Sequence, residues 1–245
     1  MRAIYNKLAD TYDFRSNNPT TLLVRKKENK LIEKFAEGRV LDFGCGTGYH
    51  LSLFFPKKSL QAIQKKGITD MIGLDISENM IAKAHKAGIK NLIQSTEALP
   101  LKDGKFDTII CLYSVFNLLD YKKAVEEFSR VLRPGGHIVL SVASVWDNED
   151  VNFLQKVKKV KKPERKRFRL EKLFMEMKLV NPEILIDTFS NKSLQLMHFD
   201  SIYRLQKPRW GNFQNFSLKQ RLKLKVEKIL PKSYGCFYFF VFQKS

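Results

Sequence analysis

The stretch from Val40 to His50 constrains the fold more than any other feature of this sequence. It reads VLDFGCGTGYH, so an apolar run suited to a buried strand ends at Asp42 and is followed by glycines at 44, 46 and 48. Glycines at the end of a strand let the backbone turn tightly and approach a ligand closely, and they direct the N-terminus of the next helix at it. The stretch therefore predicts a nucleotide-like cofactor at one edge of an α/β sheet.

The spacing of these glycines differs from that of two common nucleotide sites. The pattern is GxGxG, whereas a dinucleotide site has GxGxxG and a P-loop requires a GK[ST] that this stretch lacks. A second apolar run, MIGLDI from Met71 to Ile76, has Asp75 at its carboxyl end. Ligands of open α/β sheets lie outside the carboxyl ends of the strands, where a carboxylate can accept hydrogen bonds from ribose hydroxyls. Asp75 is therefore the strongest single candidate for a cofactor contact.

Several segments, in the expected order, resemble the class I S-adenosylmethionine (SAM) methyltransferases. DFGCGTG, preceded by apolar residues, is similar to the first motif of that family, and NLIQSTEALPLKDGKFD from Asn91 to Asp107 is similar to its third-strand segment. RVLRPGG from Arg130 to Gly136 resembles the turn into the family's fifth strand, which HIVLSVAS then supplies. Ser95 and Thr96 depart from the family pattern, which usually has Asp and Ala there.

This resemblance implies a fold, a cofactor and a set of cofactor contacts. The implied fold is α/β, with a doubly wound, mostly parallel seven-stranded sheet, N-terminal helices and a basic insertion after the fifth strand. The implied cofactor is SAM, with S-adenosylhomocysteine as the product. The residues expected to contact the cofactor are Asp42, Gly44, Cys45, Gly46, Gly48, Asp75, Ile76, Thr96, Glu97 and Ser114.

Catalytic side chains are harder to predict, because a sulfonium methyl is already activated. The enzyme then has to align the reactants, exclude water and, where needed, remove a proton. CLYSVFNLLD places Ser114 and Asn117 where the family has residues that face the transferred methyl, although an asparagine here also suits a turn cap. Tyr5 and Tyr12 belong to a segment that closes over the cofactor in quinone-type and wobble-uridine methyltransferases, although such tyrosines often only pack. Asn117, Ser114 and Tyr12 are the catalytic candidates.

Hydrophobic periodicity predicts that strands and helices alternate in the first part of the chain. Strands are expected at 39–43, 71–75, 91–94, 106–112 and 137–143, and helices at 3–13, 20–37, 47–65, 77–87, starting near Ser77, and 121–132. Such alternation implies a parallel sheet covered on both faces. After Val145 we expect a lysine-rich helical stretch over 151–180, a strand at 193–199, an amphipathic helix over 217–230 and a last buried strand at 236–242.

The whole chain is predicted to form a single methyltransferase domain, residues 1–245. Its parts are N-terminal helices (1–38), a cofactor-binding core (39–145), a basic insertion on the acceptor side (146–215) and a last helix and strand (216–245). A length of 245 residues suits one α/β domain with elaborations.

Charge is divided unevenly along the chain. Residues 1–150 contain 22 Lys and Arg against 18 Asp and Glu, whereas residues 151–245 contain 22 against 7. The segment from Lys156 to Arg169 has nine basic residues and one acid, and KPRWGNF from Lys207 places basic residues beside aromatic ones. Such a surface attracts phosphates and can stack unpaired bases, which suits RNA or another anionic substrate, such as an anionic lipid headgroup or a phosphorylated metabolite. A solvated lysine face, common in proteins from hot environments, has the same composition.

These features favour RNA, with tRNA foremost, as the methyl acceptor. The first alternative is a small or lipid-like acceptor such as a quinone, methylated at oxygen or carbon, because the quinone methyltransferases share the same core motifs. A SAM- or RNA-binding module without turnover is the second alternative. No [DN]PP[YFW] follows the expected fourth strand, which disfavours N-methylation of adenine or cytosine, and Cys111 lacks the setting of a covalent cytosine methyltransferase.

The remaining composition points to a reduced, cytoplasmic protein without a metal site. The three cysteines have neither paired nor metal-like spacing, and the four histidines are scattered. The N-terminal MRAIYNKLADTYD lacks the apolar core of a signal sequence, and the apolar run from Cys236 to Phe242 is too short to span a bilayer.

Overall fold

Seven strands form the central sheet of the computed structural model, which describes residues 1–15, 17–54, 67–94, 100–147, 165–170, 173–206, 208 and 214–245. The strands of this sheet are β1 (Gly38–Phe43), β2 (Ile68–Asp75), β3 (Leu92–Gln94), β4 (Phe106–Cys111), β5 (Leu132–Ala143), β8 (Leu194–Ile202) and β9 (Phe237–Lys244). Their order is β3-β2-β1-β4-β5-β9-β8. The first five pair in parallel, and β9 runs antiparallel to both β5 and β8. This confirms the mostly parallel seven-stranded sheet.

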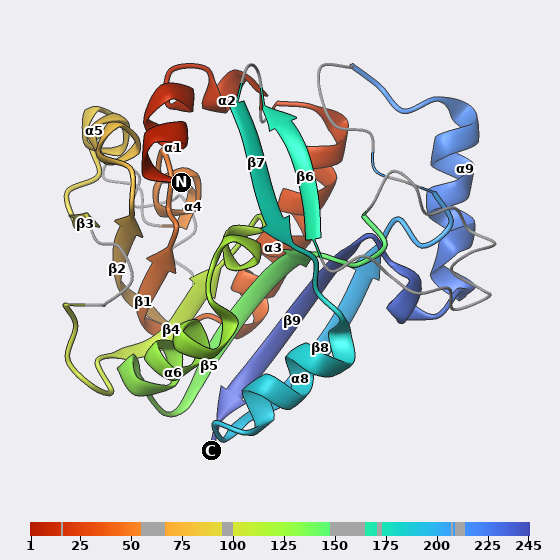
Figure 1. Cartoon of the computed structure of the whole chain (residues 1–245). Coiled ribbons are helices and arrows are strands. Elements are labelled where there is room, and N and C mark those ends of the chain that lie inside the picture. Colours follow the sequence, from red (N-terminus) through yellow and green to blue (C-terminus); the bar gives the residue numbers. More distant parts are fainter. Residues whose placement is uncertain are drawn as a thin grey trace.

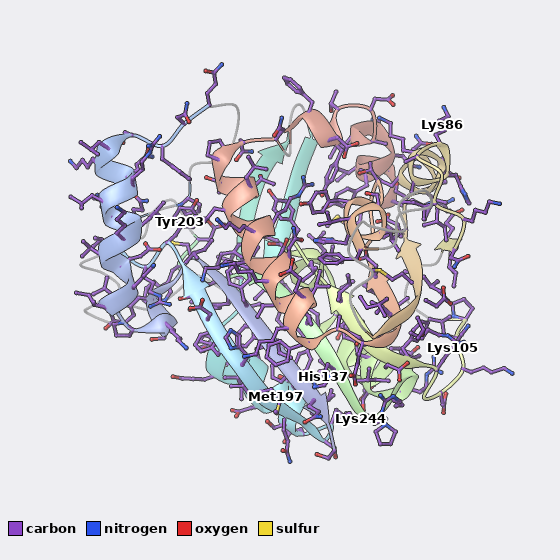
Figure 2. All side chains as sticks on the ribbon, turned by 180° about the vertical axis from the view of Figure 1, so that it is seen from behind. Lys86, Lys105, His137, Met197, Tyr203 and Lys244 are labelled. Atoms are coloured by element: carbon purple, nitrogen blue, oxygen red, sulfur yellow. The ribbon has the colours of Figure 1, made fainter. Side chains whose placement is uncertain are left out.

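Helices cover both faces of the sheet (Figure 1). The α-helices are α1 (Arg2–Leu8), α2 (Tyr12–Arg15), α3 (Pro19–Phe35), α4 (Tyr49–Phe54), α5 (Glu78–Lys86), α6 (Tyr121–Val131), α8 (Pro182–Ser190) and α9 (Leu218–Val226). Short 3-10 turns are η1 (Val115–Leu118), η2 (Glu227–Ile229) and η3 (Lys232–Tyr234). Figure 1 shows α6 and α8 on the near face, and Figure 2, from behind, shows α3 crossing the opposite face. The sheet is therefore doubly wound, as predicted.

The strands in the middle of the sheet are buried on both faces. β4, β9 and residues 138–143 of β5 are almost wholly inaccessible, and β9 reads FYFFVF without alternation because neither of its faces meets water. Helix α3 contributes Val24, Leu31 and Ile32 to the same core. The predicted last buried strand is thus confirmed, and it joins the C-terminal end of the chain to the centre of the sheet.

The N-terminal segment differs from the single helix expected over 3–13. It forms two short helices, α1 and α2, separated by a turn in which the Thr11 amide donates to the Leu8 carbonyl at 3.0 Å. Helix α3 then begins at Pro19, after Asn18, whose side chain accepts from the Thr21 amide at 3.0 Å. The turn lets α1 and α2 lie at different angles over the sheet edge.

The helical stretch predicted over 151–180 is wrong for its described residues. Residues 165–170 and 173–178 form the antiparallel strands β6 (Arg165–Leu170) and β7 (Leu173–Lys178), while 148–164 lie outside the described residues. An ion pair at 2.7 Å joins Arg165 to Glu176 across the two strands. The end of β7 is fixed by the Lys178 carbonyl, which accepts from the Asn117 amide and the Tyr121 hydroxyl. These tertiary contacts outweigh the helix propensity of a lysine-rich sequence.

Other boundaries shift by a few residues. Strand β5 begins at Leu132 rather than 137, because RPGG continues the strand with a left-handed Gly135. Of the helix expected over 47–65, residues 49–54 are described and form α4. The strand expected at 193–199 is β8. None of the described helices is both long and apolar enough to cross a bilayer.

Candidate active site

The glycine-rich turn after β1 is attached to the end of β2. The amides of Gly44 and Cys45 both donate to the Leu74 carbonyl, at 2.7 and 3.0 Å. Gly44, Gly46 and Gly48 have φ of +79°, +55° and +88°, in the left-handed region that L side chains rarely adopt. The three glycines are therefore required by the path of the chain, which brings the turn to the carboxyl ends of the strands.

Asp75, at the end of β2, connects this turn to the following helix. One of its carboxylate oxygens accepts from the Gly46 amide at 2.9 Å, and the other accepts from the Ser77 amide at 2.8 Å. Ser77 in turn caps α5, as predicted, by accepting from the Met80 amide. An ionised carboxylate offers about four lone-pair sites, so roughly two remain for a ligand. Burial raises the pKa of Asp75.

Asp42 lies beneath the same turn and is 2% exposed. Its Oδ2 has no hydrogen-bond partner among the described residues. Burial, together with the neighbouring Asp75 and Glu28 carboxyls, raises the pKa of Asp42 to about 8. A buried carboxyl without a partner is unfavourable unless it is protonated or faces a cation. The position of Asp42 therefore suits a positively charged ligand.

The N-terminal helices α1 and α2 are tied to both parts of this site. From α1, the Asn6 Oδ1 accepts from the Ser77 hydroxyl at 2.6 Å, and the Asn6 carbonyl accepts from the Asn79 side chain at 3.0 Å. From α2, Asp13 accepts from the Thr47 hydroxyl of the glycine-rich turn at 2.6 Å. Figure 1 shows α1 beside α4 and α5 at this end of the sheet. The two helices thus form a cover over the turn.

Two tyrosines of this cover approach the site from above. Among the described residues, the atom nearest to a methyl group added at Gly46 belongs to the Tyr12 ring, at 3.9 Å, so the ring lies directly against the turn. Burial raises the pKa of Tyr12 well above its usual range, and burial together with Asp75 does the same for Tyr5. Both hydroxyls stay protonated at neutral pH, and they are hydrogen-bond donors rather than bases.

The turn after β4 contains two residues in an unusual backbone conformation. Tyr113 and Ser114 have φ of +53° and +66°, which costs energy in residues other than glycine and is often found at functional sites. The Tyr113 amide donates to Glu28 Oε1 at 3.0 Å and to the Ser141 hydroxyl at 2.7 Å. Its own hydroxyl lies 2.6 Å from the Thr21 hydroxyl. These contacts hold Ser114, a predicted site residue, at the sheet edge.

Glu28 of α3 is a buried titratable residue near the site that the sequence did not reveal. It is fully buried, accepts from Ser141 as well as Tyr113, and burial raises its pKa to about 7. Its Oε2 lies 3.8 Å from Nε2 of His50. This contact is not an ion pair, because burial lowers the pKa of His50 to about 3 and the imidazole is neutral. Glu28 occurs in VRKKENK, which reads as a solvated face, so no local signal marks it.

Asn117 occupies a different kind of position from the other candidates. Its side-chain amide is buried, donates to the carbonyls of Ala143 and Lys178 at 2.9 and 2.6 Å, and accepts from the Ala143 amide at 2.9 Å. These bonds use both of its donors and join η1 to β5 and β7. Asn117 therefore positions backbone segments, and it has no N–H left for a methyl acceptor.

The structure thus brings most of the predicted site residues together at one edge of the sheet, whereas two of them are not among the described residues. The glycine-rich turn with Cys45, the end of β2 with Asp75 and Ile76, and the turn with Ser114 all lie at the carboxyl ends of adjacent parallel strands. Cys45 is buried and, like the other two cysteines, free. Thr96 and Glu97 lie outside the described residues. Within the described residues no group of His, Cys, Asp or Glu is arranged to hold a metal.

Replacing Glu28 with glutamine is expected to stabilise the protein at pH 8. The pKa of Glu28 is about 7 in the folded protein, against 4.5 for the ordinary carboxyl of the unfolded chain. The raised pKa therefore stabilises the folded protein fully below pH 4.5, and this stabilisation is lost as the pH rises to 7. The loss is about 3 kcal/mol at most. Glutamine keeps the acceptor for Tyr113 and offers an N–H to neutral His50. Melting temperatures at pH 5 and pH 8 test this prediction.

The wild type should lose more stability than Glu28→Gln between these two pH values. Asp42, whose pKa is raised in the same direction, leaves a residual pH dependence in the variant. Glu28→Ala is the control, because it removes the charge and also the carboxylate acceptor of Ser141 and Tyr113, whose amide keeps only the Ser141 hydroxyl. An unchanged pH dependence in Glu28→Gln would contradict a raised pKa for Glu28.

Comparison with known proteins identifies the family. The methyltransferase domain family matches residues 41–140, from β1 to within β5. The protein MJ1123 of Methanocaldococcus jannaschii, itself uncharacterized, is 31% identical over 68% of this chain and 71% of its own length. A demethylmenaquinone methyltransferase of Lactococcus lactis is 33% identical over 57% of this chain and 56% of its own. The chain belongs to the class I SAM-dependent methyltransferases, as the motifs predicted.

A solved structure shows the same fold at low sequence identity. A SAM-dependent methyltransferase of Thermotoga maritima, described as a possible histamine N-methyltransferase, superposes over the full length of both chains with a TM-score of 0.60 and 19% identity. The chain spans 56% of the Lactococcus enzyme and 62% of a second M. jannaschii relative, MJ1252. The chain thus spans less than two thirds of these two relatives.

The family's cofactor is SAM, and the side chains at this edge of the sheet fit it. Bound SAM supplies an activated sulfonium methyl and carries positive charge at its sulfonium and amino groups. The unpartnered Oδ2 of Asp42 and the remaining lone pairs of Asp75 supply oxygen acceptors for these positively charged groups. The geometry therefore agrees with the chemistry of the cofactor.

Proposed function

We propose that this protein transfers the methyl group of SAM to a small, lipophilic, aromatic acceptor of the quinol type. In this proposal Asp75 holds the ribose hydroxyls, Asp42 faces the positively charged part of the cofactor, and the backbone at Gly44, Cys45, Gly46 and Gly48 lies against it. Ile76 and Ser114 complete the described contacts. Thr96 and Glu97 remain proposed contacts from the sequence.

The cover formed by α1 and α2 carries this proposal. It is fixed by hydrogen bonds at Ser77 and at Thr47, so it closes the site from both sides of the glycine-rich turn. Tyr12 and Tyr113 add aromatic rings to this enclosure. A closed site with aromatic walls admits a flat, apolar molecule and excludes water, which methyl transfer from SAM requires. An open groove would suit a long polymer better.

The titratable groups near the site also favour an acceptor that is nucleophilic by itself. The tyrosine hydroxyls keep their protons, and His50 is neutral and buried behind Glu28. Tyr12 and Ser114 can donate or accept a hydrogen bond and so orient an acceptor oxygen. An electron-rich ring carbon or a phenolate needs little further activation. The relationship to demethylmenaquinone methyltransferases supports this class of acceptor.

Incubation with labelled SAM tests the proposal. We expect label to enter the organic extract of the source's membranes, and to enter a soluble naphthoquinol offered alone. Tyr12→Phe should keep SAM affinity within about two-fold and lower kcat, since only the orienting hydroxyl is lost. Label that appears in RNA, and not in the lipid extract or the naphthoquinol, would contradict the proposal.

RNA remains the second candidate because of the charge distribution. Residues 151–245 have 22 Lys and Arg against 7 Asp and Glu, but residues 156–164 of the most basic segment lie outside the described residues. If that segment binds RNA, replacing Lys158, Lys159, Lys161 and Lys162 together with alanine should weaken RNA binding and flatten its salt dependence, whose slope is near 0.7 per phosphate contact for single strands. SAM affinity should stay unchanged. Salt-independent RNA binding would remove this candidate.

A further inference from the structure

We infer that helix α9 docks the protein on an anionic phospholipid surface. The purpose of this docking, access to a lipophilic acceptor, rests on the proposed function. Leu218, Leu222 and Val226 recur every fourth residue, so they form one row along α9, and Ile229 continues the row in η2. They are 84%, 60%, 45% and 84% exposed. These four residues, which we call the α9 row, are apolar and are covered by none of the residues that the structure describes.

Cations flank the α9 row on both sides. At 100° per residue, Lys219 and Lys223 lie on one side of the row, and Arg221 and Lys225 lie on the other. None of these four side chains forms an ion pair with a described residue. An apolar row between two rows of cations can place its side chains at the acyl boundary while the cations contact anionic headgroups. RNA would complement the cations but would leave the row exposed to water.

The C-terminal end of the helix is anchored to the rest of the protein, and its apolar row faces outward. Leu224, on the opposite side of α9, packs against the core. At the C-terminal end, the buried Glu227 carboxylate accepts from the amides of Tyr203 and Arg204, at 2.8 and 3.0 Å. The Arg204 guanidinium donates to the Leu230 carbonyl at 2.9 Å. These contacts fix the end of α9 at η2, and Leu224 sets which side of the helix faces the protein.

The position of α9 agrees with delivery of an acceptor from a membrane. Strand β8 runs antiparallel to β9, which runs antiparallel to β5, so the carboxyl end of β8 lies at the same edge of the sheet as Asp75 and Ser114. Figure 1 shows α9 beyond that end of β8, and Figure 2 shows it standing apart beyond Tyr203, on the side opposite Lys86 and Lys105. The docking helix and the site thus lie at the same edge of the sheet, the edge formed by the carboxyl ends of its parallel strands.

Vesicle flotation with the full-length protein tests the inference, without SAM or acceptor. The vesicles contain either phosphatidylcholine alone or phosphatidylcholine mixed with phosphatidylglycerol. We expect binding to the mixed vesicles and little binding to the neutral ones. Binding should weaken with added salt, because the Debye length falls from about 10 Å at 0.1 M to about 3 Å at 1 M.

Two triple variants separate the apolar row from the charges. Leu218→Ser, Leu222→Ser and Ile229→Ser together should reduce vesicle binding about ten-fold or more, since the inserted apolar area is lost. Lys219→Gln, Arg221→Gln and Lys225→Gln together should reduce it roughly a hundred-fold, at about 1 kcal/mol per cation. All six side chains are exposed, so melting temperatures should not fall.

Matched controls use exposed residues elsewhere on the surface. Ile184→Ser with Met197→Ser removes exposed apolar side chains from α8 and β8, and Lys86→Gln with Lys90→Gln and Lys102→Gln removes exposed cations from the far side. Both controls should bind vesicles like the wild type. Equal losses in the controls and the α9 variants would show that net charge or hydrophobicity alone drives binding, and would overturn the inference.

The remaining outcomes distinguish the inference from the proposed function. If the serine variant binds vesicles normally while the glutamine variant loses both vesicle and RNA binding, α9 is a polyanion-binding helix and the inference is wrong. If vesicles bind through α9 but neither quinol nor lipid extract is methylated, the proposed acceptor fails while the docking stands. If a soluble naphthoquinol is methylated and no vesicle binds, the docking fails alone.

Discussion

Replacement of Asp75 by alanine is expected to weaken SAM binding roughly ten- to a hundred-fold while leaving the protein folded, because a charged hydrogen bond contributes about 1.5 to 3 kcal/mol. Its carboxylate also accepts from the Gly46 and Ser77 amides, so the variant loosens the glycine-rich turn as well as losing a ligand contact. Asp75→Asn keeps one acceptor and loses the charge, so its SAM affinity should lie between that of the wild type and that of Asp75→Ala. Isothermal titration calorimetry measures all three.

Asp70→Ala provides the matched control for this experiment. Asp70 lies in the same strand, at the opposite end from the site, where it accepts from Asn91 and lies 3.8 Å from Arg39. Its removal should leave SAM affinity unchanged. Melting temperatures of both variants show whether a loss of affinity reflects a loss of folded protein. Unchanged binding in a folded Asp75→Ala protein would exclude Asp75 from the site.

The parts of the fold that the sequence predicted are those that depend on local pattern. The run MIGLDI predicted a strand ending at Asp75, and β2 ends there. Ser77 was expected to start the next helix, and it caps α5. Glycines 44, 46 and 48 implied a turn that other residues cannot make, and each has a left-handed φ. In these places propensity, hydrophobic pattern and turn chemistry agree, so residues that are neighbours in the sequence are sufficient to predict the local structure.

The residues that escaped prediction depend on contacts between distant parts of the chain. Glu28 is buried because Tyr113 and Ser141, which lie 85 and 113 positions later, enclose it. Its neighbours are lysines and an asparagine, so its own segment predicts a solvated acid. The left-handed Tyr113 likewise depends on bonds to Glu28 and Ser141. Periodicity carries no information about such pairs.

The segments after β5 also show that local sequence pattern does not predict contacts between distant parts of the chain. A lysine-rich sequence predicted a helix where β6 and β7 pair, since strand pairing depends on a partner. An amphipathic helix over 217–230 was predicted and α9 is present, followed by η2. The pattern of α9 does not say which side faces the protein. In the structure Leu224 packs inward and the four-residue α9 row faces outward, and this orientation is what suggests docking.

Replacement of Gly46 by alanine is expected to block SAM binding more than it destabilises the fold. The added methyl would meet only the Tyr12 ring, at 3.9 Å, so the neighbouring structure accommodates it. The left-handed φ of +55° costs about 1 to 2 kcal/mol, which lowers the melting temperature by a few degrees, about 2–4 °C per kcal/mol. The same methyl projects into the space where the cofactor is proposed to lie, and overpacking by about 1–3 kcal/mol gives roughly a five- to hundred-fold loss of affinity.

Replacement of Gly48 by alanine should give the opposite balance. A methyl group there would lie 2.1 Å from Ile89 Cδ1 and 3.4 Å from Ala84, so it collides with the segment at the end of α5. Its φ of +88° adds backbone strain. We therefore expect a larger fall in melting temperature than for Gly46→Ala, and a smaller loss of SAM affinity in the protein that remains folded. Calorimetric titration and thermal denaturation of both variants measure these two effects. If Gly48→Ala lost more affinity and less stability than Gly46→Ala, the proposed position of the cofactor against Gly46 would be wrong.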